Sequence, residues 1–186
     1  MLNRKQFIEK YTPFVLQLTK GTKIFPETLF AQAIVESQGP VNGVYYPGQS
    51  GLAKNYFNFF GIKASAGWTG PVVNKATGEV FNGIPTTINS FFRVYTSFEE
   101  SAKDYIKFLQ QNQRYTTYGV FTAPTYQDQI KALKNAGYAT GLNYISVITS
   151  VADYVNGILK NITPGKIVGG AGLIAILGIG LYLILK

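Results

Sequence analysis

The chain has 186 residues with a formal net charge of +8, and it contains neither cysteine nor histidine. This composition suits one compact domain with an appendage, and it excludes disulfides, thiolate zinc sites, Ser-His-Asp triads and Cys-His peptidase chemistry. Carboxylates and tyrosines are left as the proton-transfer groups, and the sequence implies no metal and no organic cofactor. The Lys and Arg residues are scattered singly, so the positive charge indicates attraction to an anionic polymer or surface and not to nucleic acid.

The sequence up to residue 158 predicts a mainly helical α+β domain with a small β-hairpin lobe. Alternation with β-branched residues over 81–95, together with an Asn-Gly pair at 82–83, predicts the hairpin. Apolar residues at helical spacing predict the helices, which cover residues 5–18, 25–37, 98–111, 127–135 and 144–159.

Residues 167–186 predict one transmembrane helix, which follows a linker at 159–166. The run from Ile167 to Leu185 has no charged residue, and at about 1.5 Å per residue it nearly spans a hydrocarbon core of about 30 Å. Its glycines are spaced so that two such helices can self-associate. The alternative is a buried hairpin of the domain. Because the first ten residues carry charges where a secretion signal needs an apolar run, we expect the C-terminal segment to be the membrane anchor.

Glu36 carries the strongest chemical signal, because it is a single carboxylate on an otherwise apolar helical face. Leu29, Ala33 and Glu36 recur at helical spacing within residues 25–37. A low dielectric disfavours the charged form, so this carboxyl is expected to stay protonated near neutral pH and to donate a proton to a leaving group, as glycosidase general acids do. From the helix alone, a carboxylate that tips into solvent or caps a neighbouring loop is the open alternative.

Four short strings follow this acid in order, and together they carry a resemblance. They are Asn58-Phe-Phe-Gly-Ile-Lys-Ala64, Gly67-Trp-Thr-Gly-Pro-Val72, Phe92-Arg-Val-Tyr95 and Ala136-Gly-Tyr-Ala-Thr140. The set resembles the glucosaminidase domain of glycoside hydrolase family 73, which includes flagellar peptidoglycan hydrolases, and the resemblance covers roughly residues 25–154. Each string is weak alone, but their order and spacing argue against chance similarity.

The resemblance implies a lysozyme-like fold and cleavage of the β-1,4 bond after N-acetylglucosamine in peptidoglycan. It makes Glu36 the general acid. It makes Glu79, in the hairpin, a second carboxylate that activates water or holds the substrate while the sugar's own N-acetyl group attacks. It places Tyr138 in the cleft, where the hydroxyl would position the N-acetyl group or water. The alternatives are a solvent-facing Glu79 and a core-packed Tyr138 whose hydroxyl is bonded to backbone.

Four further residues are predicted to bind substrate. Trp68 is expected to stack on a sugar face, and Phe59 either stacks there or packs beneath the cleft. Asn58 is expected to bond to loop backbone near the acid. Tyr144 matches a tyrosine of the family, although the residues just before it depart from the family pattern. The segment 41–50, after the general acid, departs as well, which leaves the substrate register in that part of the groove open.

Together these patterns predict a membrane-anchored peptidoglycan hydrolase that cuts between N-acetylglucosamine and N-acetylmuramic acid. Its expected partners are glycan strands and, through residues 167–186, a lipid bilayer. The expected setting is a phage particle that opens the wall during genome delivery, or the envelope of a bacterial cell. Two alternatives remain. One is a muramidase or lytic transglycosylase of the same fold, in which Glu79 is dispensable, and the other is a non-catalytic wall-binding membrane protein.

Overall fold

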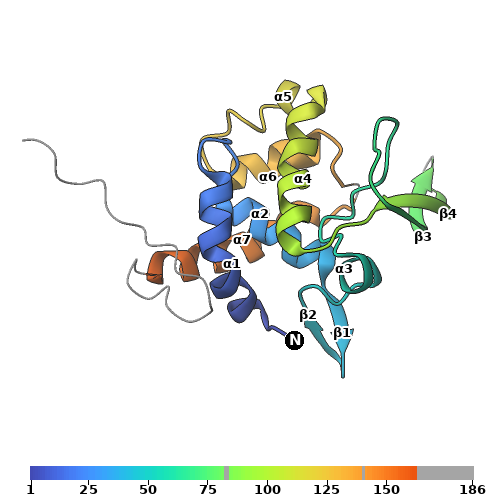
Figure 1. The fold of residues 1–186 in the computed structure, drawn as a ribbon. Helices are drawn as coiled ribbons and strands as arrows, with labels where there is room; N and C mark the ends of the chain where they lie inside the picture. Colours follow the sequence, from blue (N-terminus) through green and yellow to red (C-terminus); the bar gives the residue numbers. More distant parts are fainter. Residues whose placement is uncertain (82–83, 140, 163–186) are drawn as a thin grey trace, which may run out of the picture.

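The computed structural model describes residues 1–162 except 82, 83 and 140, and the side chains of 79–81, 84 and 85 are also outside its described part (Figure 1). As predicted, the fold is a mainly helical α+β arrangement with small hairpins. In chain order the elements are α1 (Arg4–Thr19), α2 (Pro26–Ser37), β1 (Gly39–Val41), β2 (Val44–Tyr46), α3 (Gly51–Tyr56), β3 (Val72–Phe81), β4 (Ile84–Arg93), α4 (Phe98–Gln111), α5 (Gln113–Thr117), α6 (Tyr126–Asn135) and α7 (Tyr144–Asn161).

The predicted helices are present, and polar capping residues mark where they begin. At the start of α1, the Asn3 side chain accepts a hydrogen bond from the Gln6 backbone N–H at 2.9 Å, and the Gln6 side chain accepts from the Asn3 N–H at 3.0 Å. Ser97 caps α4 in the same way, because its hydroxyl accepts from the Glu100 N–H at 3.2 Å. Pro26 occupies the first turn of α2, where a missing N–H leaves no hydrogen bond unmade.

α2 is the central helix of the helical lobe. It packs against α1, α6 and α7, and Figure 1 shows it enclosed between α1 and α4. Every residue from Thr28 to Ile34 is buried, so burial is not confined to one face of the helix. Glu36 therefore lies at the end of a helix whose preceding residues are buried from solvent on all sides.

β3 and β4 form an antiparallel hairpin, and together with the loop 61–71 they make up the β-lobe. The strand register pairs Glu79 with Thr86. Phe92 of β4 is buried, and its backbone bridges to Lys63 of the loop. In Figure 1 the hairpin projects from the helical lobe on the side away from α1. The small β-lobe predicted from the alternation of residues 81–95 is therefore confirmed.

A partly buried ion pair holds the β-lobe to α4. Arg93 donates from Nη1 to Oδ2 of Asp104 at 2.8 Å, and the Tyr95 hydroxyl donates to the same oxygen at 2.7 Å. On its other side, the Arg93 guanidinium lies 4.5 Å from the centroid of the Trp68 ring. Since Arg93 and Trp68 belong to the β-lobe and Asp104 to α4, these contacts fix the direction in which the β-lobe leaves the helices.

The sequence did not reveal the second hairpin, β1 and β2, which follows α2 directly. Ser37 fastens it at its far end, because its hydroxyl accepts from the Gly48 N–H at 2.9 Å and its carbonyl accepts from the Ser50 N–H at 2.7 Å. Gly39 must be glycine here, since a Cβ atom would overlap the backbone of Gln49. The hairpin is thus bonded to the residue next to the predicted acid.

No helix within residues 1–162, leaving out 82, 83 and 140, is long and apolar enough to cross a membrane. The predicted transmembrane helix, 167–186, lies outside the described residues, as does the predicted linker from 163 onward. α7 continues to Asn161, and Leu159 still packs against the core.

Candidate active site

Glu36 has the environment expected of a general acid. It is the penultimate residue of α2 and is only partly exposed. Within the described part of the chain, no group donates a hydrogen bond to its carboxylate or forms an ion pair with it. Burial raises its pKa from 4.5 to about 7, so the carboxyl is close to half protonated at neutral pH. The raised pKa predicted from the apolar helix is confirmed.

Three tyrosines from different parts of the chain lie close enough to Glu36 for its charge to act on them. They are Tyr105 of α4, Tyr138 after α6 and Tyr144 at the start of α7. Burial is the main cause of their raised pKa values, and the Glu36 carboxylate raises each pKa further. The Tyr138 ring centroid lies 6.1 Å from that of Tyr105 and 6.5 Å from that of Tyr144. Neutral phenols offer no positive charge to stabilise a carboxylate, so this environment favours the protonated acid.

Gln32, which the sequence reasoning did not single out, connects two of these tyrosines. It is completely buried and lies one helical turn before Glu36. Its Oε1 accepts a hydrogen bond from the Tyr105 hydroxyl, and its Nε2 donates to the Tyr144 hydroxyl. The Tyr144 hydroxyl keeps its own proton for another partner. The signal that could have found Gln32 is a polar residue inside an apolar helical run.

Tyr138 lies in the site, and its hydroxyl donates to the backbone carbonyl of Phe60 at 3.0 Å. That bond uses its only proton, although the oxygen can still accept. The turn before it requires glycine, because Gly137 has a φ of +76°. Lys134 holds the following loop by donating to the carbonyls of Ala139 and Gly141, each at 2.9 Å. Packing against the core with the hydroxyl bonded to backbone is the arrangement considered as the alternative for Tyr138, and a role in the cleft stays a prediction.

Asn58 is buried and binds only backbone. Its Nδ2 donates to the carbonyls of Ile62 at 2.9 Å and Arg93 at 2.8 Å, and its Oδ1 accepts from the Ile62 N–H at 3.0 Å. The expected bonding to loop backbone is confirmed. The residue joins the loop to β4, and both ends of its amide are used, so it supports the site from beneath.

Phe59 lies in the core and not on a sugar-binding surface. Its side chain is 7% exposed, and its ring centroid lies 5.8 Å from that of Phe7 and 5.1 Å from that of Phe98. Of the two positions considered for Phe59, packing is therefore the one found, and its assignment as a substrate-binding residue is corrected. The physical reason is that α1 and α4, both remote in the sequence, close over the ring.

Trp68 is partly exposed on the loop of the β-lobe. Its Nε1 donates to the Pro71 carbonyl at 3.2 Å, and its ring lies against the Arg93 guanidinium described above. Gly70 also approaches the ring so closely that a Cβ atom there would overlap it. Contacts with Arg93 and Gly70 hold the indole in place, and stacking on a sugar stays a prediction for its remaining surface.

The backbone of Glu79 lies in β3, opposite Thr86. Its side chain is outside the described part of the structure, so its role as a second carboxylate stays a prediction.

A hollow of about 310 Å3 has the volume of a small ligand site, although Glu36 is not among the residues that line it. Tyr144 and Val35, the residue before Glu36, both line it. Tyr144 is otherwise buried, so this hollow is where a substrate could reach its ring. A second hollow, of about 690 Å3, lies between α6 and α7 and contains no predicted site residue.

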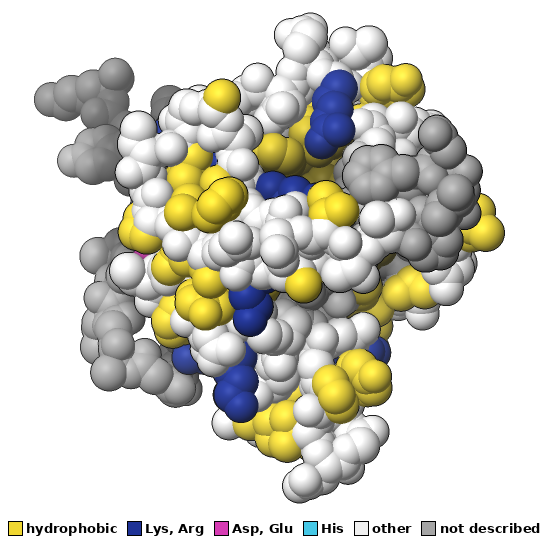
Figure 2. All heavy atoms as spheres, turned by 90° about the vertical axis from the view of Figure 1, so that its right-hand side faces the viewer, with side chains coloured by type: hydrophobic (Ala, Val, Ile, Leu, Met, Phe, Trp, Pro, Cys, Tyr) yellow, Lys and Arg dark blue, Asp and Glu magenta, His cyan; other side chains and the backbone are white. Residues whose placement is uncertain are grey.

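The surface on the β-lobe side suits an anionic ligand. Figure 2 shows this face, with Lys, Arg and apolar side chains distributed over it and acidic side chains nearly absent from its visible, described part. The positive charge expected from the composition is thus displayed on the side that bears the β-lobe.

The amino-acid sequence is similar to those of known proteins. The sequence model of the Glucosaminidase family, described as mannosyl-glycoprotein endo-beta-N-acetylglucosaminidase, matches residues 12–157. The peptidoglycan hydrolase FlgJ of Salmonella typhimurium is 39% identical over 107 residues, which are 58% of this chain and 33% of FlgJ. A probable N-acetylmuramidase of Lactococcus lactis subsp. cremoris is 30% identical over 156 residues, covering 81% of this chain and 33% of that protein. This chain thus spans about a third of these relatives.

The fold is also similar to that of a solved structure. A C-terminally truncated glycoside hydrolase domain from Salmonella typhimurium FlgJ superimposes with a TM-score of 0.58 at 32% sequence identity, covering 87% of this chain and all of that one. The fold, with a partly buried acid at the end of its central helix, is of the lysozyme-like type shared with that glycoside hydrolase domain. More specifically, the chain belongs to the glucosaminidase family, as the match over residues 12–157 shows.

Proposed function

We propose that this protein hydrolyses the β-1,4 bond between N-acetylglucosamine and N-acetylmuramic acid in peptidoglycan, with Glu36 as the general acid. The observation that carries the proposal is a carboxyl with a pKa of about 7, without an ion-pair partner in the described structure, at the end of the central helix. The name of the FlgJ relative supports peptidoglycan as substrate.

In this mechanism, protonated Glu36 donates its proton to the glycosidic oxygen while positive charge develops on the sugar. Glu79 is the proposed second carboxylate, acting either as a base on water or as support for an attack by the N-acetyl group. Tyr138 and Tyr144 are proposed to position the reacting groups near the acid.

The test is mass spectrometry of the muropeptides released from purified peptidoglycan. Products with reducing-end N-acetylglucosamine, lost in Glu36→Gln, would support a glucosaminidase. Glu27→Gln is the matched control, because Glu27 lies in the first turn of the same helix and its carboxyl takes no part in the proposed chemistry. No release by the unaltered protein would favour a wall-binding role instead.

A second candidate is a muramidase or lytic transglycosylase, which the name of the Lactococcus relative favours. Products ending in reducing muramic acid or its anhydro form would identify it. Near-full activity of Glu79→Gln would also count for it, since one acid suffices for that chemistry.

For its setting, we propose that residues 167–186 anchor the enzyme in a membrane, with the linker before them acting as a tether. Support comes from the sequence alone, which has no charge between Ile167 and Leu185. A phage particle that opens the wall locally is one such setting, and the Gly-rich segment would permit pairing of helices. Release of the protein from membranes by alkaline carbonate, without detergent, would refute the anchor.

A further inference from the structure

Arg114 is an arginine without a carboxylate partner beside the loop that carries Tyr138. It belongs to α5 and is exposed. Its Nη2 donates to the Tyr115 hydroxyl at 2.6 Å, and its guanidinium carbon lies 4.7 Å from the Tyr115 ring centroid. Within the described residues, no Asp or Glu forms an ion pair with it. Since a guanidinium has five N–H donors, most of them are left for a ligand.

Contacts with Tyr115 orient the exposed guanidinium. Tyr115, which it contacts, is completely buried and lies with its ring centroid 6.4 Å from that of Tyr138. A Cβ atom on Gly137 would lie 3.7 Å from Arg114 Nη1, so the guanidinium is close to the backbone just before Tyr138. Arg114 is therefore separated from the tyrosines around Glu36 by a single layer of side chains.

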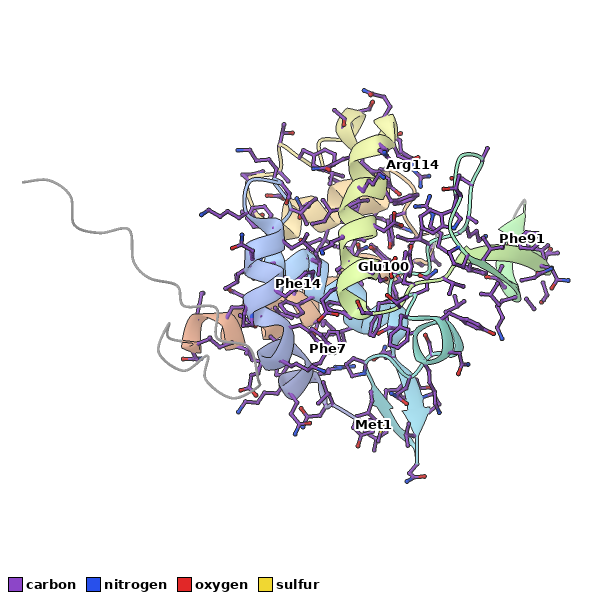
Figure 3. All side chains as sticks on the ribbon, viewed as in Figure 1. Met1, Phe7, Phe14, Phe91, Glu100 and Arg114 are labelled. Carbon is purple, nitrogen blue, oxygen red and sulfur yellow. The ribbon has the colours of Figure 1, made fainter. Side chains whose placement is uncertain are left out.

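Arg114 also lies on the side of the molecule that bears the β-lobe. Figure 3 shows it on the side of the helical lobe toward the β-lobe, and this is the face on which Figure 2 shows few acidic side chains. A planar guanidinium with its orientation fixed by a neighbour is suited to bind both oxygens of one carboxylate. The proposed substrate offers such groups on its muramic acid residues. These are the lactyl carboxylate of a peptide-free residue and the carboxylates of the attached peptide.

We propose that Arg114 forms a carboxylate-binding subsite for the substituent of the muramic acid residue next to the cleaved bond. This inference rests on the proposed function and adds the part of the substrate that the enzyme recognises. Arg114 contributes to binding and leaves the chemistry at Glu36 unchanged.

The experiment compares the full-length protein with Arg114→Gln on three substrates below saturation. These are intact peptidoglycan, strands freed of peptide by an amidase, and peptidoglycan whose carboxylates have been chemically amidated. We expect about a tenfold loss of rate for Arg114→Gln on substrates that carry the recognised carboxylate and no loss on the amidated one. A loss on intact peptidoglycan alone identifies the peptide carboxylate, and a loss on the peptide-free strands identifies the lactyl group.

Two further variants separate binding from folding. Tyr115→Phe keeps the ring and removes the hydroxyl that orients Arg114, so it should give a smaller loss with the same dependence on substrate. Lys10→Gln removes one positive charge from α1, on the far side of the helical lobe, and should change nothing. An equal loss on all three substrates, or none on any, would overturn the subsite. Absence of cleavage by the unaltered protein would instead overturn the proposed function and this inference with it.

Discussion

Replacing Glu36 by glutamine should stabilise the protein, and the gain should depend on pH. The folded state raises the pKa of Glu36 from 4.5 to about 7, so between these values it retains a proton that the unfolded chain has lost. The stability that this group contributes is present below pH 4.5 and is lost as the pH rises toward 7. At ~1.4 kcal/mol per pKa unit the loss is at most ~3.5 kcal/mol, and we take ~3 kcal/mol because Glu36 is partly exposed and solvent screens it.

Glutamine keeps the shape of the side chain and cannot ionise. Glu36→Gln should therefore match the unaltered protein at about pH 4 and exceed it by up to ~3 kcal/mol at about pH 8. For a domain of this size that corresponds to a rise in Tm of about 6–12 °C. Thermal unfolding of both proteins at a series of pH values measures the difference, with Glu27→Gln as control. A difference that stays constant across this range would refute the argument that burial of the acid opposes folding.

Three other outcomes are expected. Initial rates of hydrolysis should fall as the pH rises through about 7, because Glu36 loses its proton, and a rate that is flat to pH 9 would contradict its role as acid. Asp104→Asn should lower the free energy of unfolding by ~3 kcal/mol in urea, because Arg93 would keep a partly buried charge without its carboxylate. Tyr138→Phe should cost about 1 kcal/mol through its lost bond to Phe60. In that variant the hydrolysis rate should also fall about tenfold, and an unchanged rate would make the hydroxyl purely structural.

The longer helices α1, α2, α4, α6 and α7 were predictable because local patterns determine them, whereas the short helices α3 and α5 were not predicted. Capping residues and apolar spacing are read within a few positions, and the apolar residues before Glu36 indicated that this end of the helix would be buried, although the burial itself comes from α1, α6 and α7 packing around α2. β1 and β2 were not predicted, because strands of three residues are too short to show an alternation of apolar and polar residues.

The roles of individual aromatic residues depend on contacts between distant parts of the chain. Phe59 and Trp68 look alike as candidates for sugar stacking, yet Phe59 is covered by α1 and α4 while Trp68 stays at the surface. Gln32 likewise acquires its importance only when α4 and α7 bring tyrosines to both ends of its amide. For Glu79, the sequence resemblance is still the main argument.

One serine next to the acid also explains how the following segment can differ so much from the family pattern. The Ser37 hydroxyl donates to the Ala33 carbonyl inside α2 and accepts from Gly48, and the Ser37 carbonyl accepts from Ser50. The hairpin formed by β1 and β2 therefore begins just after Ser37, and the residues that follow it are hydrogen-bonded back to Ser37. Because both ends of this segment are bonded to Ser37, we expect that its length and chemistry can change while the backbone at Glu36 stays in place.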